Sequence, residues 1–394
     1  MERFNQGRYD FMECKALFDK IDEHNGEYVK VWEDICNIES PTAYKEGVDA
    51  CSAYLAKIAE NRGWKIERKK MENVGDVLVF TMNPKSDAKP FALSGHLDTV
   101  HPVGLFGTPA VRIDGNKMYG PGTMDCKGGV VAGMLAMHAL EEIGFDKRPV
   151  MMLLQTDEEV GSSLSEKATI NYICEKSKDA VGFINLEGYT KGEVCIARKG
   201  VVTFTFKITG IEAHAANCAK RGASAILEAA HKIIELEKLK DHEGLTCNCG
   251  VIKGGSVQNT VPGYCEFKAN IRFATYEQYE WVKKYAQDIA NTVCVNGCTC
   301  ELVQSSFRIC MTYEDRNAVL LEQMNDIWEK NGFTRLKGEM HNGGSDAADV
   351  SAYGIACIDC LGTTGGGIHS PNEYSNIDSL AENAKRIASV IKFI

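Results

Sequence analysis

The chain has 394 residues, of which 44% are hydrophobic and 25% are charged, a composition typical of a folded globular protein and not of a disordered one. Its 44 basic and 54 acidic side chains give a formal net charge of −10, so we expect neither nucleic acid nor an anionic membrane as a partner. No stretch approaches the roughly 18 consecutive apolar residues of a membrane-spanning helix.

The first half of the chain alternates between helical and strand patterns. Residues 48–59 carry apolar side chains at helical spacing, whereas 76–80, 91–94 and 149–154 are short apolar runs typical of strands. Small apolar residues fill 130–140, which predicts a helix packed closely on a sheet. Strands that alternate with helices predict an α/β domain with a largely parallel sheet.

The pattern changes near residue 198. Strand-like runs at 200–208 and 264–272 are each followed by a predicted helix, the first at 223–239 and the second around Trp281. Apolar and polar side chains alternate along 264–272, which is typical of a strand with one exposed face. We therefore expect an inserted α+β domain. The predicted domains are 1–197 with 312–394, and 198–311.

The sixteen cysteines are the unusual part of the composition. The first ten residues lack the apolar core of a signal peptide, so we expect a cytoplasmic protein whose thiols stay reduced. Two groups are closely spaced: Cys247 with Cys249, and Cys294 with Cys298 and Cys300. Neither has the paired C-x2-C spacing of a structural zinc site. Buried thiols are the expected outcome, ahead of disulfides or a structural metal.

Four segments at predicted strand ends collect His, Asp and Glu, namely 94–100, 119–129, 155–161 and 184–188, and a glycine-rich loop at 365–373 adds another histidine. In open α/β sheets, sites form outside the carboxyl ends of the strands. Imidazole and carboxylate groups suit Zn²⁺, and two histidines with several carboxylates suit a two-metal hydrolytic site. Each segment alone fits a solvated turn, but burying all these groups unpaired would cost several kcal/mol.

The five segments resemble the metal-site motifs of the M20 family of zinc metallopeptidases. That family includes glutamate carboxypeptidase, acetylornithine deacetylase, succinyl-diaminopimelate desuccinylase, aminoacylase and di- and tripeptidases. The resemblance spans nearly the whole chain, and G-H-x-D-x-V at 95–100 and D-E-E-x-G at 157–161 are its most specific motifs. It implies a phosphorylase/hydrolase-like catalytic domain with a mixed, largely parallel sheet. It also implies an inserted α+β, ferredoxin-like lid or dimerisation domain, and hence a homodimer.

The resemblance implies a metal role for five positions. His96 and Glu187 resemble the ligands of the first metal, and Glu159 and His369 those of the second. Asp125 resembles the carboxylate that bridges the two metals. Two Zn²⁺ ions are the expected cofactors, although the same ligands also suit Co²⁺ or Mn²⁺.

Five further positions resemble residues that take part in catalysis or substrate binding. Glu158 resembles the general base, and Asp98 the carboxylate that orients the first-metal histidine. His214 resembles the histidine that reaches the active site of the other subunit and stabilises the oxyanion. Asn259 and Arg272 resemble substrate-binding residues, and Arg272 is matched to the group that binds a carboxylate in the glutamate carboxypeptidase branch. A surface histidine and an ordinary solvated arginine remain the alternatives for His214 and Arg272.

The expected activity is therefore hydrolysis of an amide bond next to a free carboxylate. A small peptide or an N-acyl amino acid would be the substrate, and a C-terminal amino acid such as glutamate the product. At position 187 the glutamate resembles glutamate carboxypeptidase and the desuccinylase, whereas aminoacylases and many tripeptidases often carry Asp there. An N-acyl amino acid deacylase or a dipeptidase is the alternative enzyme. A binding protein without activity is a further rival, but the presence of every ligand and of the base argues against it.

Overall fold

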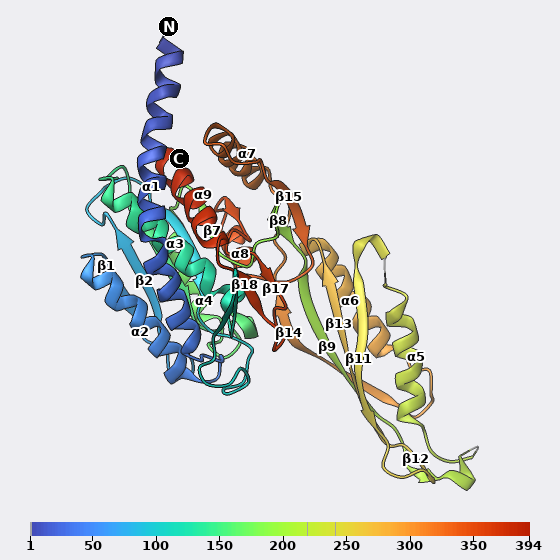
Figure 1. Cartoon of the computed structure of the whole chain (residues 1–394). Helices are drawn as coiled ribbons and strands as arrows, with labels where there is room; N and C mark the ends of the chain where they lie inside the picture. Colours follow the sequence, from blue (N-terminus) through green and yellow to red (C-terminus); the bar gives the residue numbers. More distant parts are fainter. Residues whose placement is uncertain (1, 219, 241) are drawn as a thin grey trace. The chain divides into compact units, whose positions relative to one another are not determined.

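The computed structural model describes residues 2–218, 220–240 and 242–394, and the side chains from Cys14 onward other than residues 219, 241 and 243 (Figure 1). The chain divides into two compact units. Unit 1 comprises residues 1–196, 313–339 and 349–394, and unit 2 comprises 197–312 and 340–348.

The second unit includes residues 340–348, which were expected in the first domain. Hydrogen bonds explain this membership, since Lys199 N donates to His341 O at 3.0 Å and the Arg198 guanidinium donates to Gly343 O at 3.1 Å. Two short strands lie at the unit boundaries and pair with each other, β8 (Glu193–Arg198) and β15 (Lys337–His341).

The core of unit 1 is a six-stranded sheet in the order β1-β2-β6-β3-β7-β16. These strands are β1 (Lys65–Lys69), β2 (Val77–Met82), β6 (Val150–Gln155), β3 (Phe91–His96), β7 (Phe183–Asn185) and β16 (Cys357–Ile358). The pairs β6–β3, β3–β7 and β7–β16 are parallel, whereas β1–β2 and β2–β6 are antiparallel. Every residue of β2, β3 and β6 is buried, as expected for strands covered on both faces. The predicted mixed, largely parallel sheet is confirmed.

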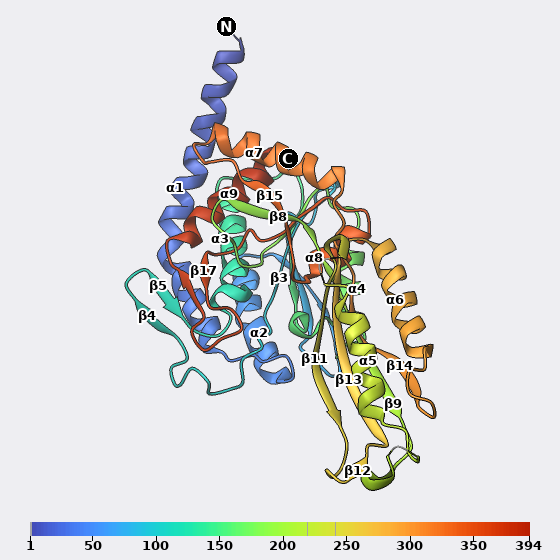
Figure 2. The same ribbon diagram turned by 90° about the vertical axis from the view of Figure 1, so that its right-hand side faces the viewer.

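Helices cover this sheet. They are α1 (Glu2–Asn37), α2 (Lys45–Asn61), α3 (Gly128–Glu142), α4 (Ala168–Ser177), α7 (Asp315–Lys330) and α9 (Ser379–Phe393), while α8 (Asp346–Ala352) lies across the unit boundary. Helix α3 packs on β3 and β6, and α1 and α9 pack on α3, a group visible in Figures 1 and 2. A Cβ atom on Gly129 would lie 1.9 Å from the carbonyl oxygen of Leu186, so the close approach of α3 requires glycine there.

A second, four-stranded antiparallel sheet in unit 1 has the order β17-β18-β5-β4. Its strands are β17 (Gly365–Gly366), β18 (Tyr374–Asn376), β5 (Lys117–Tyr119) and β4 (Arg112–Asp114). Tyr374 of β18 pairs with Tyr119 of β5, so the loop between β17 and β18 lies beside the loop that follows β5. These two loops carry His369 and Asp125.

Unit 2 is built on a four-stranded antiparallel sheet in the order β11-β13-β9-β14. Its strands are β11 (Thr246–Gly254), β13 (Tyr264–Phe273), β9 (Gly200–Thr209) and β14 (Thr299–Arg308), with a small pair β10 (Ala213–His214) and β12 (Thr260–Val261). Helices α5 (Ala225–Glu237) and α6 (Tyr276–Asn291) pack on this sheet, and buried residues alternate with less buried ones along β13. This is the one-sided α+β arrangement that the sequence predicts.

Twelve of the sixteen cysteine side chains are buried, which agrees with the expectation of thiols within the core. Over the described part of the chain, no helix combines the length and apolar character needed to cross a membrane.

Candidate metal centre and active site

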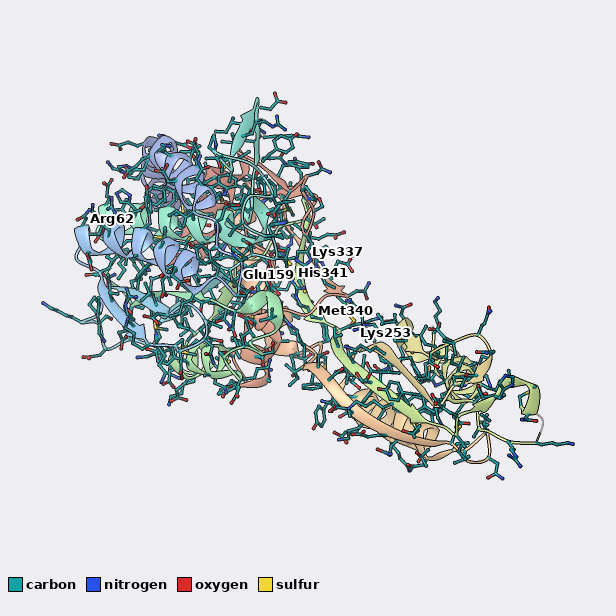
Figure 3. All side chains as sticks on the ribbon, turned by 90° about the horizontal axis from the view of Figure 1, so that it is seen from below. Arg62, Glu159, Lys253, Lys337, Met340 and His341 are labelled. Carbon is teal, nitrogen blue, oxygen red and sulfur yellow. The ribbon has the colours of Figure 1, made fainter. Side chains whose placement is uncertain are left out.

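Three parallel strands deliver the first group of site residues to one edge of the main sheet. His96 is the last residue of β3, Glu158 and Glu159 lie in the short turn after β6, and Glu187 follows β7 by two residues. Parallel neighbours end on the same side of a sheet, so these side chains converge. Figure 3 labels Glu159 among the side chains of unit 1.

Asp125 joins this group from the loop before α3. Its Oδ1 atom lies 3.0 Å from His96 Nε2, and its Oδ2 atom lies 3.1 Å from His369 Nε2. His369 Nε2 also lies 3.2 Å from Glu159 Oε2, and His96 Nε2 lies 3.6 Å from Glu187 Oε1. The peptide bond between Asp125 and Cys126 is cis. Each histidine thus has one carboxylate of its own and shares Asp125 with the other.

Asp98 is fully buried and contacts several parts of this site. Its backbone oxygen lies 2.9 Å from His96 Nδ1, whereas its carboxylate Oδ1 lies farther away at 3.5 Å. The carboxylate instead accepts the backbone N–H groups of Glu158 and Glu159, each at 3.2 Å, and the hydroxyl of Thr42 at 2.8 Å. Asp98 therefore orients both the histidine and the turn that carries the two glutamates.

Negative charge is in excess at this centre. Burial raises the pKa of Glu187 to about 8 and that of Glu159 to about 7, and the charges of Asp125 and Glu158 act in the same direction. Burial also opposes ionisation of Asp125, but hydrogen bonds from the two histidines outweigh it and hold the pKa of Asp125 well below its usual range. Buried carboxylates beside two imidazoles are the donor set that divalent metals bind. The residues present therefore fit two such ions.

Cys126 contributes a sulfur atom beside the same centre. One donor atom each from His96, Cys126 and Glu187 lie within 4.8 Å of one another, as do those from His96, Asp125 and Glu159. The thiol accepts the backbone N–H of His96 at 3.0 Å, and burial raises its pKa strongly. The thiol is therefore protonated at neutral pH.

Glu373 is a site residue that the sequence did not single out. Its buried carboxylate accepts the backbone N–H groups of Gly122, Met124 and Asp125 at 3.2, 2.9 and 3.1 Å, and lies 2.7 Å from His101 Nε2. It therefore holds the backbone of the loop that carries Asp125. The only sequence signal was its place four residues after His369 in the segment 365–373.

The remaining expected site residues lie in unit 2. His214 is exposed and its Nδ1 accepts the backbone N–H of Ala216 at 3.1 Å. Asn259 lies close to it, because Asn259 O accepts from Ala215 N at 2.8 Å. Arg272 lies near the far end of β13 and donates to Asn342 O. At about 3.4 Å per residue, it is roughly 25 Å along the strand from the β12 end where His214 and Asn259 meet.

An array of imidazoles and largely buried carboxylates at the carboxyl edge of an α/β sheet, with a further glutamate at its side, is typical of a metallohydrolase. Residues 92–392 match the model of peptidase family M20/M25/M40, and the chain belongs to this family. It is thus a hydrolytic enzyme.

Three relatives show how far the likeness extends. Carboxypeptidase G2 of Pseudomonas sp. (strain RS-16) is 27% identical over 383 residues, which cover 95% of this chain and 91% of that protein. Acetylornithine deacetylase of Myxococcus xanthus is 30% identical over 246 residues, 57% of this chain and 62% of that protein. A tripeptidase from Staphylococcus aureus subsp. aureus Mu50 has the same fold, with a TM-score of 0.79 and 22% identity over 93% of this chain and 98% of that one.

Proposed function

We propose that this enzyme uses two Zn²⁺ ions to hydrolyse an amide bond next to a free carboxylate, releasing a C-terminal amino acid such as glutamate. The substrate class is a small peptide or an N-acyl amino acid. The observation that carries the proposal is Asp125, which offers one carboxylate oxygen to each of the two site histidines. Similarity to carboxypeptidase G2 over nearly the whole chain supports the release of a C-terminal residue.

His96 and Glu187 would hold one metal, Glu159 and His369 the other, and Asp125 both. When bound, two divalent ions supply Lewis-acid stabilisation of the carbonyl oxygen and make a nearby water more acidic. Co²⁺ or Mn²⁺ could occupy the same donors in place of zinc.

Glu158 is the proposed general base. Glu158 is buried in the turn after β6, directly before Glu159, whose Oε2 atom lies 3.2 Å from His369 Nε2. Its charge acts on both Glu159 and Glu187, which is consistent with a carboxylate near both metal positions. Glu158 accepts a proton from the attacking water and donates it to the leaving nitrogen, and one carboxylate can perform both steps. Asp98 assists by fixing the backbone of the turn.

His214, Asn259 and Arg272 are the proposed substrate contacts from unit 2, with Arg272 binding the free carboxylate. The proposal includes a homodimer in which His214 acts on the partner's active site.

Mixing two inactive variants, Glu158→Ala and His214→Ala, tests this directly. Mixed dimers contain one site with both residues intact if His214 acts between subunits, so activity returns. If each subunit uses its own His214, every mixed dimer stays inactive.

A deacylase or dipeptidase is the second candidate, and acetylornithine deacetylase and the tripeptidase among the relatives support it. All these reactions use the same metal centre and differ in what flanks the amide bond.

The many buried cysteine side chains suit a reducing cytoplasm, where we place the enzyme.

A hydrolysis screen separates these candidates. Zinc-loaded enzyme is offered N-acyl amino acids and dipeptides in which the C-terminal residue is varied, with Glu158→Gln as the inactive control. A preference governed by the C-terminal residue, and strongest for glutamate, supports the carboxypeptidase. A preference governed by the acyl group supports the deacylase. Hydrolysis of dipeptides with a free amino terminus, lost when that amine is absent, supports the dipeptidase.

A further inference from the structure

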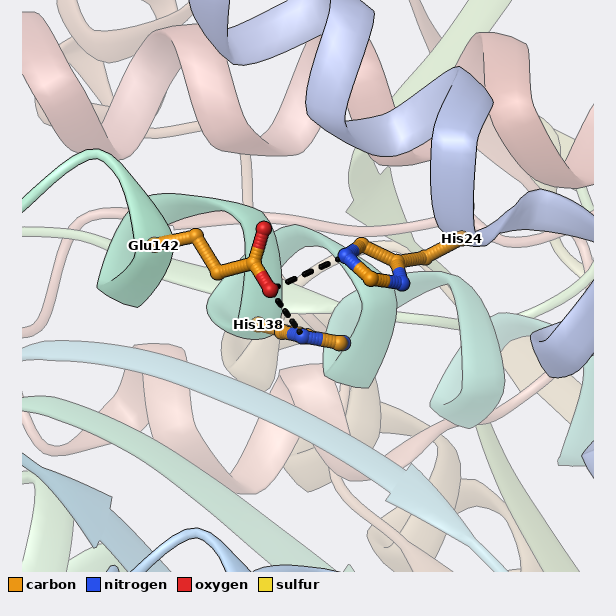
Figure 4. A group of neighbouring side chains, drawn as sticks. All are labelled: His24, His138 and Glu142. Carbon is orange, nitrogen blue, oxygen red and sulfur yellow. Dashed lines mark hydrogen bonds and ion pairs between the residues drawn. The ribbon is translucent and has the colours of Figure 1, made fainter.

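Unit 1 contains a second cluster of metal-binding side chains, made of His24 on α1 and His138 and Glu142 on α3 (Figure 4). Helix α3 begins directly after the catalytic loop, and His138 lies thirteen residues beyond Asp125. His138 lies ten residues beyond Gly128, the first residue of α3, and at 1.5 Å per helical residue this separation is about 15 Å. The cluster is therefore distinct from the catalytic centre, and nothing in the proposed hydrolysis uses it.

One oxygen of Glu142 lies between the two histidines. His24 Nε2 is 3.0 Å and His138 Nε2 is 3.1 Å from Glu142 Oε1, and the two rings overlap with their centroids 4.0 Å apart. His24 Nε2 is buried and, despite the short distance, has no partner in hydrogen-bond geometry. Hydrogen bonding alone therefore does not account for the arrangement.

We propose that His24, His138 and Glu142 bind a structural divalent transition-metal ion of the Zn²⁺ type, with water in the remaining positions. Zinc lies about 2.0–2.1 Å from imidazole nitrogen and carboxylate oxygen, so neighbouring ligand atoms are about 3 Å apart. Glu142 Oε1 already has this spacing to both histidine nitrogens, and one donor atom of each residue lies within 4.8 Å of the others. His138 and Glu142 are four residues apart on one helix face, and His24 closes the site from the second helix.

The charges suit a divalent cation. Burial, followed by the charges of Arg62 and His24, lowers the pKa of His138 to about 4. Burial opposes ionisation of Glu142, but the neighbouring side chains of His24, Lys20 and His138 outweigh it and lower the pKa of Glu142 to about 2. Glu142 therefore offers a negatively charged donor to the ion.

Two neighbouring cations leave the metal position open. Lys20 Nζ lies 3.2 Å from Glu142 Oε2, the oxygen that does not face the histidines. Arg62, labelled in Figure 3, is held 3.1 Å from Glu141 Oε2. The side chains of Glu142 and His24 are 30% and 18% exposed, which gives an ion access from solvent.

Such an ion would join α1 to α3, and α1 in turn supports the catalytic loop. Trp32 of α1 donates its indole N–H to Thr123 O at 3.2 Å. Lys127 donates to Ile35 O and Ile38 O, both at 2.9 Å. The metal is thus expected to stabilise the fold of unit 1 while contributing no group to the reaction.

Zinc content of the full-length protein tests the proposal. Wild type, His24→Asn and Glu142→Gln are equilibrated with the same excess of Zn²⁺, and bound zinc per chain is measured by mass spectrometry after removal of free metal. We expect each variant to hold one zinc fewer than wild type. His231→Asn, which removes an exposed histidine of α5, is the matched control and should hold as many as wild type.

Equal zinc content in wild type and both variants would overturn the proposal. The comparison does not depend on how many ions the catalytic centre holds, so failure of the proposed function would leave it unaffected. Thermal unfolding gives a second readout: excess Zn²⁺ should raise the Tm of wild type more than that of Glu142→Gln. Identical Tm shifts in the two proteins would contradict a bound structural metal.

Discussion

His96 and His369 face opposite oxygens of the same carboxylate, with Nε2 to Oδ distances to Asp125 of 3.0 and 3.1 Å. The two histidines come from segments more than 270 residues apart, one at the end of β3 and the other between β17 and β18. Both imidazoles must be neutral to bind a metal through these nitrogens. In the metal-free protein, however, the nearby carboxylates favour the protonated form of each imidazole.

Metal binding should therefore release protons. Hydrogen bonds to Asp125 and Glu159 raise the pKa of His369 to about 10, and burial raises that of Glu187 to about 8. Both groups are mostly protonated at pH 7 without metal and lose their protons on coordination. The apparent zinc affinity should rise as pH increases from 6 to 8. Calorimetry in two buffers of different ionisation enthalpy should show release of at least one proton. Equal heats in both buffers would contradict the ligand assignment.

Replacement of Glu158 by Gln should abolish most turnover while leaving metal content unchanged. The amide retains the shape of the side chain but cannot accept the proton of the attacking water, and loss of a general base costs about 10²–10⁴-fold. The measurement is kcat together with zinc content. Glu166→Gln, an exposed glutamate shortly after the same turn, is the control and should remain near wild type. Near-normal kcat in Glu158→Gln would exclude this residue as the base.

Asp76 should make stability depend on acid pH. Its carboxylate lies 3.1 Å from Lys45, 3.2 Å from Arg68 and 2.8 Å from Lys70, and it accepts the backbone N–H of Met71 at 3.0 Å. Burial opposes ionisation, but these contacts outweigh it and hold the pKa of Asp76 far below its usual range. Because the folded-state pKa is depressed, the stabilisation is present above about pH 4 and is lost as the pH falls further.

The variant Asp76→Asn should lose about 2 kcal/mol of unfolding free energy at pH 7, because three cations then lack their carboxylate. Urea unfolding of metal-free protein measures this, and the difference from wild type should shrink between pH 4 and pH 2. Asp114→Asn, at a side chain that is 74% exposed, should change stability by less than about 0.5 kcal/mol. A difference that stays constant with pH would show that ionisation of Asp76 is not the cause.

The strands that carry the site could be predicted because their side chains are apolar throughout. The runs at 91–94 and 149–154 correspond to β3 and β6, whose residues are all buried, and polar residues at their ends are conspicuous against such neighbours. The helix expected at 130–140 corresponds to α3, where small residues allow close contact with the sheet. The local sequence pattern was sufficient to predict an element wherever that element makes its contacts through a long face of apolar or small side chains.

The small sheet of unit 1 could not be predicted, because β17 has two residues and β4, β5 and β18 have three each, too few for a pattern. The same holds for contacts between distant segments. The sequence alone suggests that Lys127 is a surface cation. Its side chain is nevertheless fully buried and donates hydrogen bonds to the carbonyl oxygens of Ile35 and Ile38. Glu373 reads as part of a polar loop, and only the fold shows that three backbone N–H groups point at it.

Glu373→Gln should weaken metal binding although Glu373 is not itself a ligand. Oε1 accepts the backbone N–H groups of Met124 and Asp125, and Oε2 accepts that of Gly122. An amide NH₂ in place of either oxygen therefore leaves at least one backbone N–H without its acceptor, and the loop shifts. Loss of a group that orients metal ligands typically costs 10–100-fold in affinity or activity, and we expect about that loss in zinc affinity. Competition with a fluorescent chelator measures it. Asn372→Ala, at the exposed neighbouring position, should retain wild-type affinity. Unchanged zinc affinity in Glu373→Gln, with the fold intact by circular dichroism, would show that Asp125 is positioned without this carboxylate.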